Sequence, residues 1–534
     1  MSERDDSTHS ILIPEILGQI FEHLVLDRND PALFLVNADP PRKRDLISCA
    51  LSCKAFTPLA LSLAWRQMDS VLPLLKLLPG LEFVDNQYVL TDLLTETDLV
   101  RFDSYAPLIK EYYHFLQRLD EDPFQDIIPR FSPSILSRIT QLRPVLLPSL
   151  TTFTCDAYGF YERIEIDFFV SPSLKHVKIH AINHPLKTTE ILMYFPLLAS
   201  RALDVQKLEL SVSLPASPSC FRTISCLTNL RCLSLSFEED DVSFSSGSTV
   251  PRDIESLGIL EYLEELRIHG LHTVETAYAL RSPVTLDTFK SLKTLAIFGE
   301  YSLVKTVFDL CQHSPIHRLQ FEPSPLDPRM VRTISHAVSQ WTSTLEHLTA
   351  CHQFDNPPQS EIVLEMSRNI EPLASLSNLK SLTITAALVN YAAYIVRDED
   401  VIAIAETWPG LEELELTVMT KDFGSGPSVR VLKVLADKCR NLKRVAMPLN
   451  LDLPEVPANV SSPTQLSTHG LESFKISVIS SVSGERLDKV RVDVLAYYIW
   501  SAFPRVRNVL RSSDYAFGEL WDDVQEEVEK LQGR

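Results

Sequence analysis

Cys49 and Cys53 lie four residues apart, so a helix would present both thiols on one face, as it could present two metal ligands. A structural zinc site takes four ligands, and no second pair of Cys or His residues stands at a matching distance in the sequence. The spacing is better explained by two thiols in the core of a small helical segment. The sequence therefore predicts no metal site and no cofactor.

A second set of residues alternates along predicted strands. His176, Lys178 and His180 occupy every second position and would share one face of a strand. Such a face could line a pocket for an anion, or it could simply be solvated. Glu413 and Glu415 repeat the arrangement with the opposite charge.

No combination of residues predicts catalysis. Ser, His and Asp are plentiful, but nothing in their order marks a catalytic triad. Fourteen glycines in 534 residues is a low content, which argues against loops that cradle phosphate groups. The isolated Gly424-Ser425-Gly426 is most simply a loop. We expect that the chain is not an enzyme.

Composition narrows the partners and the compartment. A net charge of −20 repels phosphate backbones, so we expect a protein partner and no nucleic acid. Nine cysteines are an odd and sparse set, unlike the disulfide framework of a secreted protein. The N-terminus is polar and resembles no signal peptide, and no apolar stretch is long enough to span a membrane. We expect no membrane association and a cytoplasmic and/or nuclear location.

The pattern L-x-x-L-x-L recurs between about residues 150 and 510, at intervals of 24 to 35 residues. Eleven copies are clear, and their three apolar residues are Leu174/Val177/Ile179, Val205/Leu208/Leu210, Leu230/Leu233/Leu235, Leu263/Leu266/Ile268, Leu292/Leu295/Ile297, Ile316/Leu319/Phe321, Leu345/Leu348/Ala350, Leu379/Leu382/Ile384, Leu411/Leu414/Leu416, Leu442/Val445/Met447 and Leu471/Phe474/Ile476. Weaker copies are Leu150/Phe153/Cys155 and Val506/Val509.

Each copy predicts a short strand whose second and third apolar residues point inward together. The residue between them points outward, and it is mostly polar, as at Lys178, Glu209, Arg267, Gln320, Thr383, Glu415 and Lys475. One short strand cannot bury its apolar face alone, whereas stacked neighbours can. An ordinary α/β domain with leucine-rich strands is the alternative.

Helical spacing between the strands supports the stacked arrangement. Leu303, Val304, Val307, Phe308 and Cys311 follow one helical face, and so do Leu432, Leu435, Ala436 and Cys439 after Pro427-Ser428. The predicted fold class is α/β, a solenoid of about 12 or 13 repeats over residues 146–512 with parallel strands on its concave side. Residues 513–534 predict an amphipathic helix that caps the open end, and residues 68–145 a helical linker that caps the start.

Residues 11–67 predict a separate small helical domain behind a disordered segment, residues 1–10. Ile13, Ile16, Leu17, Ile20, Phe21 and Leu24 follow the spacing of an amphipathic helix with Pro14 near its start. Asp45 predicts the N-cap of a second helix, and Thr57-Pro58 the start of a third. Three short helices make a marginal domain, which often leaves apolar surface for a partner to cover.

These residues resemble the F-box. The family pattern opens with Leu-Pro-x-Glu-Ile-Leu, matched by Ile13-Pro14-Glu15-Ile16-Leu17, and continues through Ile20-Phe21 and Leu24. Its middle is similar to Asp45-Leu46 with Cys49 to Phe56, and its closing Trp is Trp65. Residues 27–44 make a longer connection than the family usually has. Arg101-Phe102 and Tyr105-Ala106 resemble the segment that follows the F-box in many basidiomycete F-box proteins.

The repeats resemble the leucine-rich-repeat superfamily of the irregular, cytosolic kind, which folds as a horseshoe. Together the two resemblances imply the substrate receptor of an SCF-type (Skp–cullin–F-box) ubiquitin ligase. The F-box would dock onto a Skp-type adaptor of the cullin complex, and the concave strand face would hold an unknown target protein. The chain would then be a monomer within a larger complex. The alternative is a repeat scaffold outside any ligase, with the small helical domain as a plain N-terminal cap.

The resemblances also imply which residues carry each contact. For the adaptor they are Pro14, Ile16, Leu17, Ile20, Leu24, Leu51, Lys54 and Trp65. For the target protein they are the outward strand residues Lys178, Glu209, Arg267, Gln320, Thr383, Glu415 and Lys475.

Overall fold

The computed structural model describes most of the chain, and it divides into two compact units. The described residues are 14–22, 41–85, 87–116, 130–157, 166–181, 188–212, 218–237, 254–271, 288–324, 328–353, 362–387, 392–418, 426–450, 469–476, 489–510 and 518–533. The first unit comprises Met1–Leu233 and Phe237–Asp240, and the second comprises Ser234–Ser236 and Asp241–Arg534. The predicted disordered segment, residues 1–10, lies outside the described residues.

Within the described residues, the main feature is a sheet of 15 strands. Its strands follow one another in this order: β1 (Gln67–Met68), β4 (Glu111–Leu116), β6 (Thr152–Ala157), β7 (His176–Ala181), β8 (Lys207–Val212), β9 (Cys232–Phe237), β10 (Glu265–Leu271), β11 (Thr294–Glu300), β12 (Arg318–Ser324), β13 (His347–Gln353), β15 (Ser381–Ala387), β17 (Glu413–Val418), β18 (Arg444–Met447), β19 (Ser473–Ile476) and β20 (Asn508–Leu510). Every pair in it whose register is described is parallel, for example β10 with β11 and β15 with β17. The predicted α/β class with stacked parallel strands is confirmed, and the arrangement is compatible with a solenoid.

The apolar residues of the repeat build the core. In β11, Leu295 and Ile297 are fully buried, as is Leu292, which precedes the strand. Neighbouring strands align motif on motif, so that Leu295 lies beside Leu319 of β12. Each strand therefore buries its apolar face against the same positions of the next one, as the periodicity predicts.

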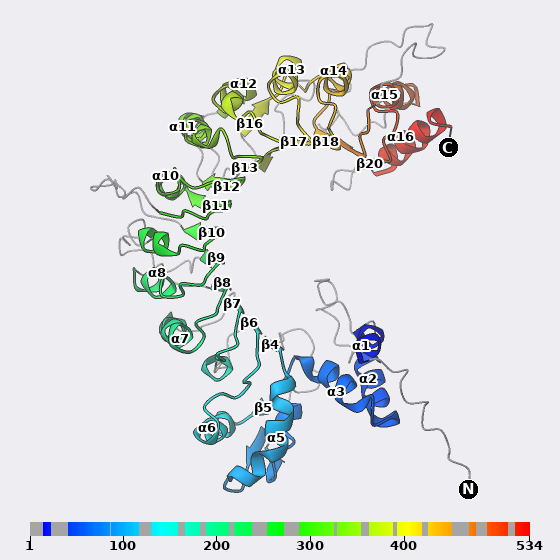
Figure 1. Ribbon diagram of the computed structural model, residues 1–534. Helices are drawn as coiled ribbons and strands as arrows, with labels where there is room; N and C mark the ends of the chain where they lie inside the picture. The colour runs from blue at the N-terminus through cyan, green and yellow to red at the C-terminus, as the bar shows by residue number, and fades with distance from the viewer. Residues whose placement is uncertain are drawn as a thin grey trace, which may run out of the picture. The chain divides into compact units, whose positions relative to one another are not determined.

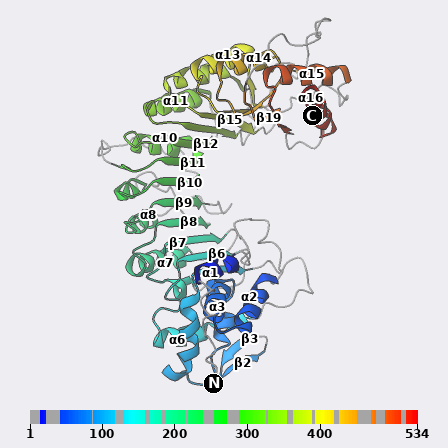
Figure 2. The same cartoon turned by 45° about the vertical axis from the view of Figure 1, so that its right-hand side comes forward.

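Helices cover one face of the sheet within each unit (Figure 1 and Figure 2). In the first unit they are η5 (Ile166–Phe169), α7 (Thr188–Arg201) and α8 (Pro218–Ile224); in the second they are η6 (Glu255–Ile259), α10 (Tyr301–Leu310), α11 (Pro328–Val338), η7 (Ser339–Trp341), α12 (Met366–Ile370), η8 (Glu371–Ser375), α13 (Asp398–Thr407), α14 (Val431–Lys438) and α15 (Lys489–Ala502). Both helices expected from spacing, α10 and α14, bury the predicted apolar residues. A second, two-stranded parallel sheet pairs β14 (Ile362–Glu365) with β16 (Ala392–Ile395). No helix in the described ranges combines the length and the apolar character needed to cross a bilayer.

In the part of the chain that the structure describes, three helices precede the sheet: α1 (Pro14–Glu22), α2 (Pro41–Ser52) and α3 (Thr57–Arg66). The third begins where Thr57-Pro58 predicted. The second begins four residues before the predicted N-cap, so Asp45 lies inside the helix and is exposed. Pro41 tolerates the first helical turn because it lacks only an N–H that would have no partner there. The last part of the 27–44 connection is therefore helical, while residues 23–40 lie outside the described residues.

Residues 68–145 differ from the predicted helical linker, because they contain strands as well as helices. Their elements are α4 (Leu72–Leu75), β2 (Leu81–Val84), β3 (Gln87–Leu90), η3 (Glu96–Leu99), α5 (Val100–Tyr105), η4 (Ala106–Leu108), β4, β5 (Arg130–Phe131) and α6 (Pro133–Leu142). Strand β4 belongs to the main sheet and pairs with β1, which follows α3 without an intervening residue. Among the described residues the sheet therefore starts at residue 67, far ahead of the start predicted for the repeats at residue 146. The aromatic residues Tyr112, Tyr113 and Phe115 favour a strand there.

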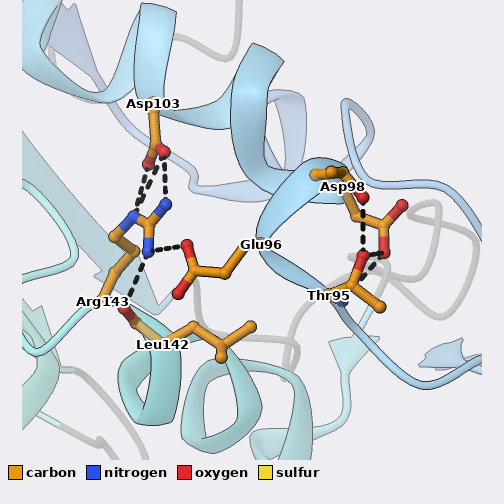
Figure 3. Close-up of polar contacts among 7 residues, drawn as sticks. Thr95, Glu96, Asp98, Asp103, Leu142 and Arg143 are labelled. Atoms are coloured by element: carbon orange, nitrogen blue, oxygen red, sulfur yellow. Dashed lines mark hydrogen bonds and ion pairs between the residues drawn. The ribbon is translucent and has the colours of Figure 1, made fainter.

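Arg143 ties the elements of this region together at the end of α6 (Figure 3). Its Nε and Nη2 donate to the carboxylate of Asp103 in α5, with an Nη2 to Oδ2 distance of 2.8 Å, and its Nη1 donates to Glu96 in η3 at 2.6 Å. Hydrogen bonds to both carboxylates raise the pKa of Arg143 above its usual value. At the start of η3, Thr95 hydrogen-bonds Asp98 through its backbone N–H and its hydroxyl, which lowers the pKa of that carboxyl.

We expect Arg143→Lys to lower the melting temperature of the first unit. A lysine ammonium keeps the charge but cannot make the forked contact with Asp103 while also reaching Glu96. The measurement is thermal unfolding in low and high salt, with Arg101→Lys as the matched control because Arg101 is exposed on α5. Equal melting temperatures for the two variants would contradict the assigned role.

Helix α16 (Gly518–Leu531) lies where the C-terminal cap is expected. Val524 and Val528 are buried, whereas Asp522, Asp523 and Glu526 are exposed. The side chain of Gln525 accepts a hydrogen bond from Val509 N–H at 2.7 Å and donates to the Arg507 carbonyl at 3.2 Å. Gln532 donates to the carbonyls of Pro504 and Val506 at 3.1 and 2.8 Å. The helix thus satisfies backbone groups in and just before β20.

Candidate functional site

The first candidate surface is apolar and lies on the N-terminal helices. Ile47 and Leu51 stand four residues apart on α2, so they share one face of the helix, and their exposed fractions are 44% and 83%. Ile20 on α1 is exposed to 53%. We call these three residues the apolar helix surface. Ile47 and Leu51 lie next to each other on α2, and exposed apolar side chains that lie together are typical of a surface that a partner covers.

A compact core supports this surface from beneath. Phe21 of α1, Leu46 and Ala50 of α2, and Ala60 and Ala64 of α3 form one buried cluster. The Phe21 ring meets the Phe56 ring edge-on, with 5.5 Å between the centroids. The opposite face of α2 is therefore occupied by the core, which leaves Ile47 and Leu51 directed outward.

The eight predicted adaptor residues divide into three groups. Ile20, Leu51 and Lys54 are exposed, and so are available to a partner. Leu17 is 8% exposed and Trp65 packs against the core cluster, so both serve the inside of the domain. The side chains of Pro14 and Ile16, and the whole of Leu24, lie outside the described residues.

Trp65 also joins the small domain to the segment that follows. Its ring contacts the Tyr105 ring at the end of α5, with 4.8 Å between the centroids. Phe102 and Ala106 beside it are buried. Backbone hydrogen bonding continues the junction, because Lys110 N–H donates to the Arg66 carbonyl at 2.9 Å. The helices are thus connected to the sheet through packed residues.

The second candidate surface is the face of the sheet that the helices leave open. All seven outward residues predicted from the repeat occupy the same register position in their strands. In the first unit Lys178 pairs with Glu209. In the second unit Arg267, Ala296 and Gln320 are successive partners, and Thr349, Thr383, Glu415, Ala446 and Lys475 continue the row. Their predicted alignment is confirmed, and their role in binding stays a prediction.

In the second unit, several charged groups of this face are already paired. Arg267 pairs with Glu265 on its own strand, and Arg444 pairs with Glu413 on the neighbouring one. Ser381 Oγ donates to Glu413, and Thr417 Oγ1 donates to Glu415. Along the edge where the strands begin, Lys380 pairs with Glu346 and Lys443 with Glu412, which lowers the pKa of each carboxyl. These pairs leave a face of mixed polarity with hydroxyl groups between the charges.

In the first unit, the open face has more positive than negative groups on strands β7 and β8. Lys207 Nζ lies 2.6 Å from Glu209, and Lys178 Nζ lies 3.9 Å from the same carboxylate. His176 lies beside Lys207 in the register, and burial lowers its pKa together with the positive charges of Lys207 and Lys175. One carboxylate on these two strands is therefore shared by two lysines.

Two features of these surfaces lay outside the predicted residues. Ile47 was not among them, although its spacing of four residues from Leu51 on a helix is a signal for it. The strand positions two residues before the predicted row, such as Lys207 and Arg444, face the same way and carry much of its charge. The alternation of a strand is enough to find them once its register is known.

Several of the thiols that the structure describes are buried. Of the two thiols predicted to lie in the core, Cys49 packs against the core of the small helical domain, whereas Cys53 is half-buried just beyond the end of α2 and is not among the residues packed against that core. Burial raises the pKa of the Cys439 thiol to about 11, which keeps it protonated. Within the described ranges, no group of three or more His, Cys, Asp or Glu side chains is placed to hold a metal ion.

Comparison with models of protein families and with curated proteins gives no match to this sequence.

Proposed function

We propose that the chain is the substrate-recognition subunit of an SCF-type ubiquitin ligase. In this proposal the three N-terminal helices act as an F-box that docks onto a Skp-type adaptor bound to a cullin. The repeats form a leucine-rich-repeat horseshoe, whose open strand face holds the protein to be ubiquitylated. The chain contributes proximity and no catalytic group, because a tethered lysine gains effective concentration near the loaded ubiquitin carrier.

The observation that carries the proposal is the exposure of the apolar helix surface. A partner that covered Ile20, Ile47 and Leu51 would remove apolar surface from water, which the hydrophobic effect favours. The small domain could otherwise have buried them against its own chain. Their exposure on a segment that resembles the F-box is what an adaptor-binding surface requires.

The second candidate is a repeat scaffold that uses the helices only as an N-terminal cap. It predicts that the apolar face of the helices packs against residues 70–145. The contact of Trp65 with Tyr105 favours it, since α3 does pack there. The exposure of Ile47 and Leu51 argues against it, because a cap has no use for apolar residues left in water.

We expect the double variant Ile47→Asp with Leu51→Asp to lose capture of a Skp-type adaptor. Two carboxylates in an apolar interface must be desolvated without a partner, which should weaken binding by at least about a hundredfold. Both positions are exposed, so the domain should still fold. The measurement is co-purification of the adaptor with the full-length chain, followed by titration in solution.

Leu93→Asp is the matched control, because Leu93 is 87% exposed but lies outside the three helices. It should bind the adaptor as the unmodified chain does. The scaffold function would be favoured if the unmodified chain bound no adaptor, or if the double variant bound it equally well.

A further inference from the structure

Strands β7 and β8 carry a cluster of basic groups on their open face and starting edge. His176, Lys178 and His180 alternate on β7, and Lys207 begins β8 beside His176. Lys175 stands at the edge where β7 starts and is exposed. We call these five residues the basic strand surface. It lies wholly within the first unit of a chain whose net charge is −20.

Two of the carboxylates near this surface, those of Glu209 and Glu111, are already engaged. Glu209 is shared by Lys207 at 2.6 Å and Lys178 at 3.9 Å, so one negative charge faces two positive ones. Glu111 on β4 is 17% exposed and receives hydrogen bonds from Gln67 and Tyr113, and it lies 3.5 Å from Arg66. Asp156 of β6 occupies the register position next to His180. The positive charge of Lys175 is not paired with any residue that the structure describes.

The lysines also influence the charge of their neighbour His176. After burial, the positive charges of Lys207 and then Lys175 are the largest influences on the pKa of His176, and they lower it. Glu209 and Glu111 act in the opposite direction but more weakly. The lysines therefore add to burial in disfavouring a positive charge on His176 itself.

We propose that the basic strand surface binds a carboxylate-rich, extended segment of the target protein. The inference rests on the proposed function, since it names the class of substrate that the open sheet face would hold. Lys178 and Lys207 would exchange their shared contact with Glu209 for contacts with the carboxylates of the segment. Lys175 and the two histidines would add contacts along the length of β7.

The spacing of the charges favours several separate carboxylates over a single phosphate group. Alternate residues of a strand are about 6.6 Å apart, and neighbouring strands lie about 4.8 Å apart, so the basic groups are spread over a grid. Acidic side chains of an extended peptide repeat at a similar interval. A phosphate group is more often held by convergent arginine forks, whereas the cations here are lysines.

The same dimensions argue against a nucleic acid. A bound strand would extend beyond two β-strands and meet the acidic remainder of the chain, where its phosphates would be repelled. A short acidic segment fits within the basic strand surface. Its affinity should fall as salt is added, because exposed charges are screened.

The test uses a fluorescein-labelled peptide of alternating Glu and Gly and the full-length chain, with binding followed by fluorescence anisotropy in low salt. We expect the unmodified chain to bind this peptide and not the same peptide with Lys in place of Glu. Lys178→Glu with Lys207→Glu should weaken binding by at least about tenfold, because two attractions become repulsions.

Glu209→Gln supplies the opposite result. It removes the carboxylate that competes with the peptide for both lysines, so binding should become several times tighter. A gain of affinity cannot come from misfolding, which keeps the test decisive even if the double variant is unstable. The charge-matched control is Lys433→Glu with Arg440→Glu, both exposed in the second unit, and it should bind like the unmodified chain.

Four results would overturn the inference. They are equal binding by the double variant, equal loss in the control variant, no gain from Glu209→Gln, and tighter binding of a single-phosphoserine peptide or an oligonucleotide than of the Glu peptide. The proposed function is tested separately, since none of these substitutions touches the apolar helix surface. A variant that loses the peptide but still captures the Skp-type adaptor would separate the two.

Discussion

Trp408→Ala should destabilise the second unit by about 3–5 kcal/mol, which is the usual cost of removing a buried tryptophan side chain. Trp408 follows α13 and is 1% exposed. Its indole Nε1–H donates to the Leu376 carbonyl of the preceding repeat at 2.8 Å. The variant therefore leaves both a cavity between two repeats and a buried carbonyl without its donor.

The loss should be largest near the substitution, because each repeat contacts mainly its neighbours. The measurement is hydrogen exchange of the backbone amides of β15 and β17 with chemical denaturation of the full chain. Trp408→Phe should destabilise the second unit by about 1–3 kcal/mol less than Trp408→Ala does, because the phenylalanine ring keeps most of the packing. Tyr262→Ala is the control, because Tyr262 is exposed on the surface of the same unit and should change stability by less than about 0.5 kcal/mol. A loss below about 1 kcal/mol for Trp408→Ala would contradict the assigned packing.

Phe153→Ala should have an effect of similar size on the first unit, again about 3–5 kcal/mol. Phe153 is fully buried on β6, and its ring stacks with Tyr112 of β4 and with Phe169 of η5, at centroid distances of 6.3 and 5.3 Å. Tyr112 and Phe169 themselves stack at 4.5 Å. The three rings join strands β4 and β6 and the short helix η5 that covers them, so truncating Phe153 weakens its contacts with both other rings.

Chemical denaturation of the full chain would check this prediction. The fluorescence of the N-terminal helices, recorded in the same experiment, is a second probe of unfolding. Phe83→Ala is the control, since Phe83 is exposed on β2 and should be close to neutral. If Phe153→Ala and Phe83→Ala cost the same, the stack does not hold β4 against the rest of the sheet.

The repeats could be predicted because their signal is repeated and local. In β15 and β17, for example, Leu382 and Leu414 come from the same place in the pattern and are register partners. A strand alternates faces with period two, so the outward row follows directly from the apolar one. Even the weak copy at Val506 and Val509 is buried, and β20 forms there.

Strands β1 and β4 could not be predicted in the same way, because the pattern is degraded before residue 146. Ile109 and Tyr112 stand at the spacing of the first two apolar positions and are both buried, but His114 takes the third position. The third helix also leads directly into β1, so no polar linker marks where the sheet begins. The apolar spacing over residues 70–145 fits helices equally well, because a short apolar run does not distinguish the helical period of about 3.6 residues from the strand period of about two.

The apolar helix surface was only partly predictable for a different reason. Family resemblance selects residues by position, whereas exposure depends on how three helices pack. Leu17 and Leu51 belong to the same resemblance, yet one is in the core and the other is largely in water. Only the packing of Phe21, Leu46 and Ala50 decides which side of each helix remains open.

The hydrogen bonds of Gln525 to Val509 and Arg507 have a consequence for assembly. The last strand of a sheet offers its unpaired peptide groups to any extended chain, including a second molecule of the same protein. A primary amide has the same donor and acceptor as a peptide bond, so Gln525 takes up the backbone groups of Val509 and Arg507 that a further strand would use. The addition of another strand to β20 is disfavoured at this position, because the added strand would first have to displace the glutamine side chain.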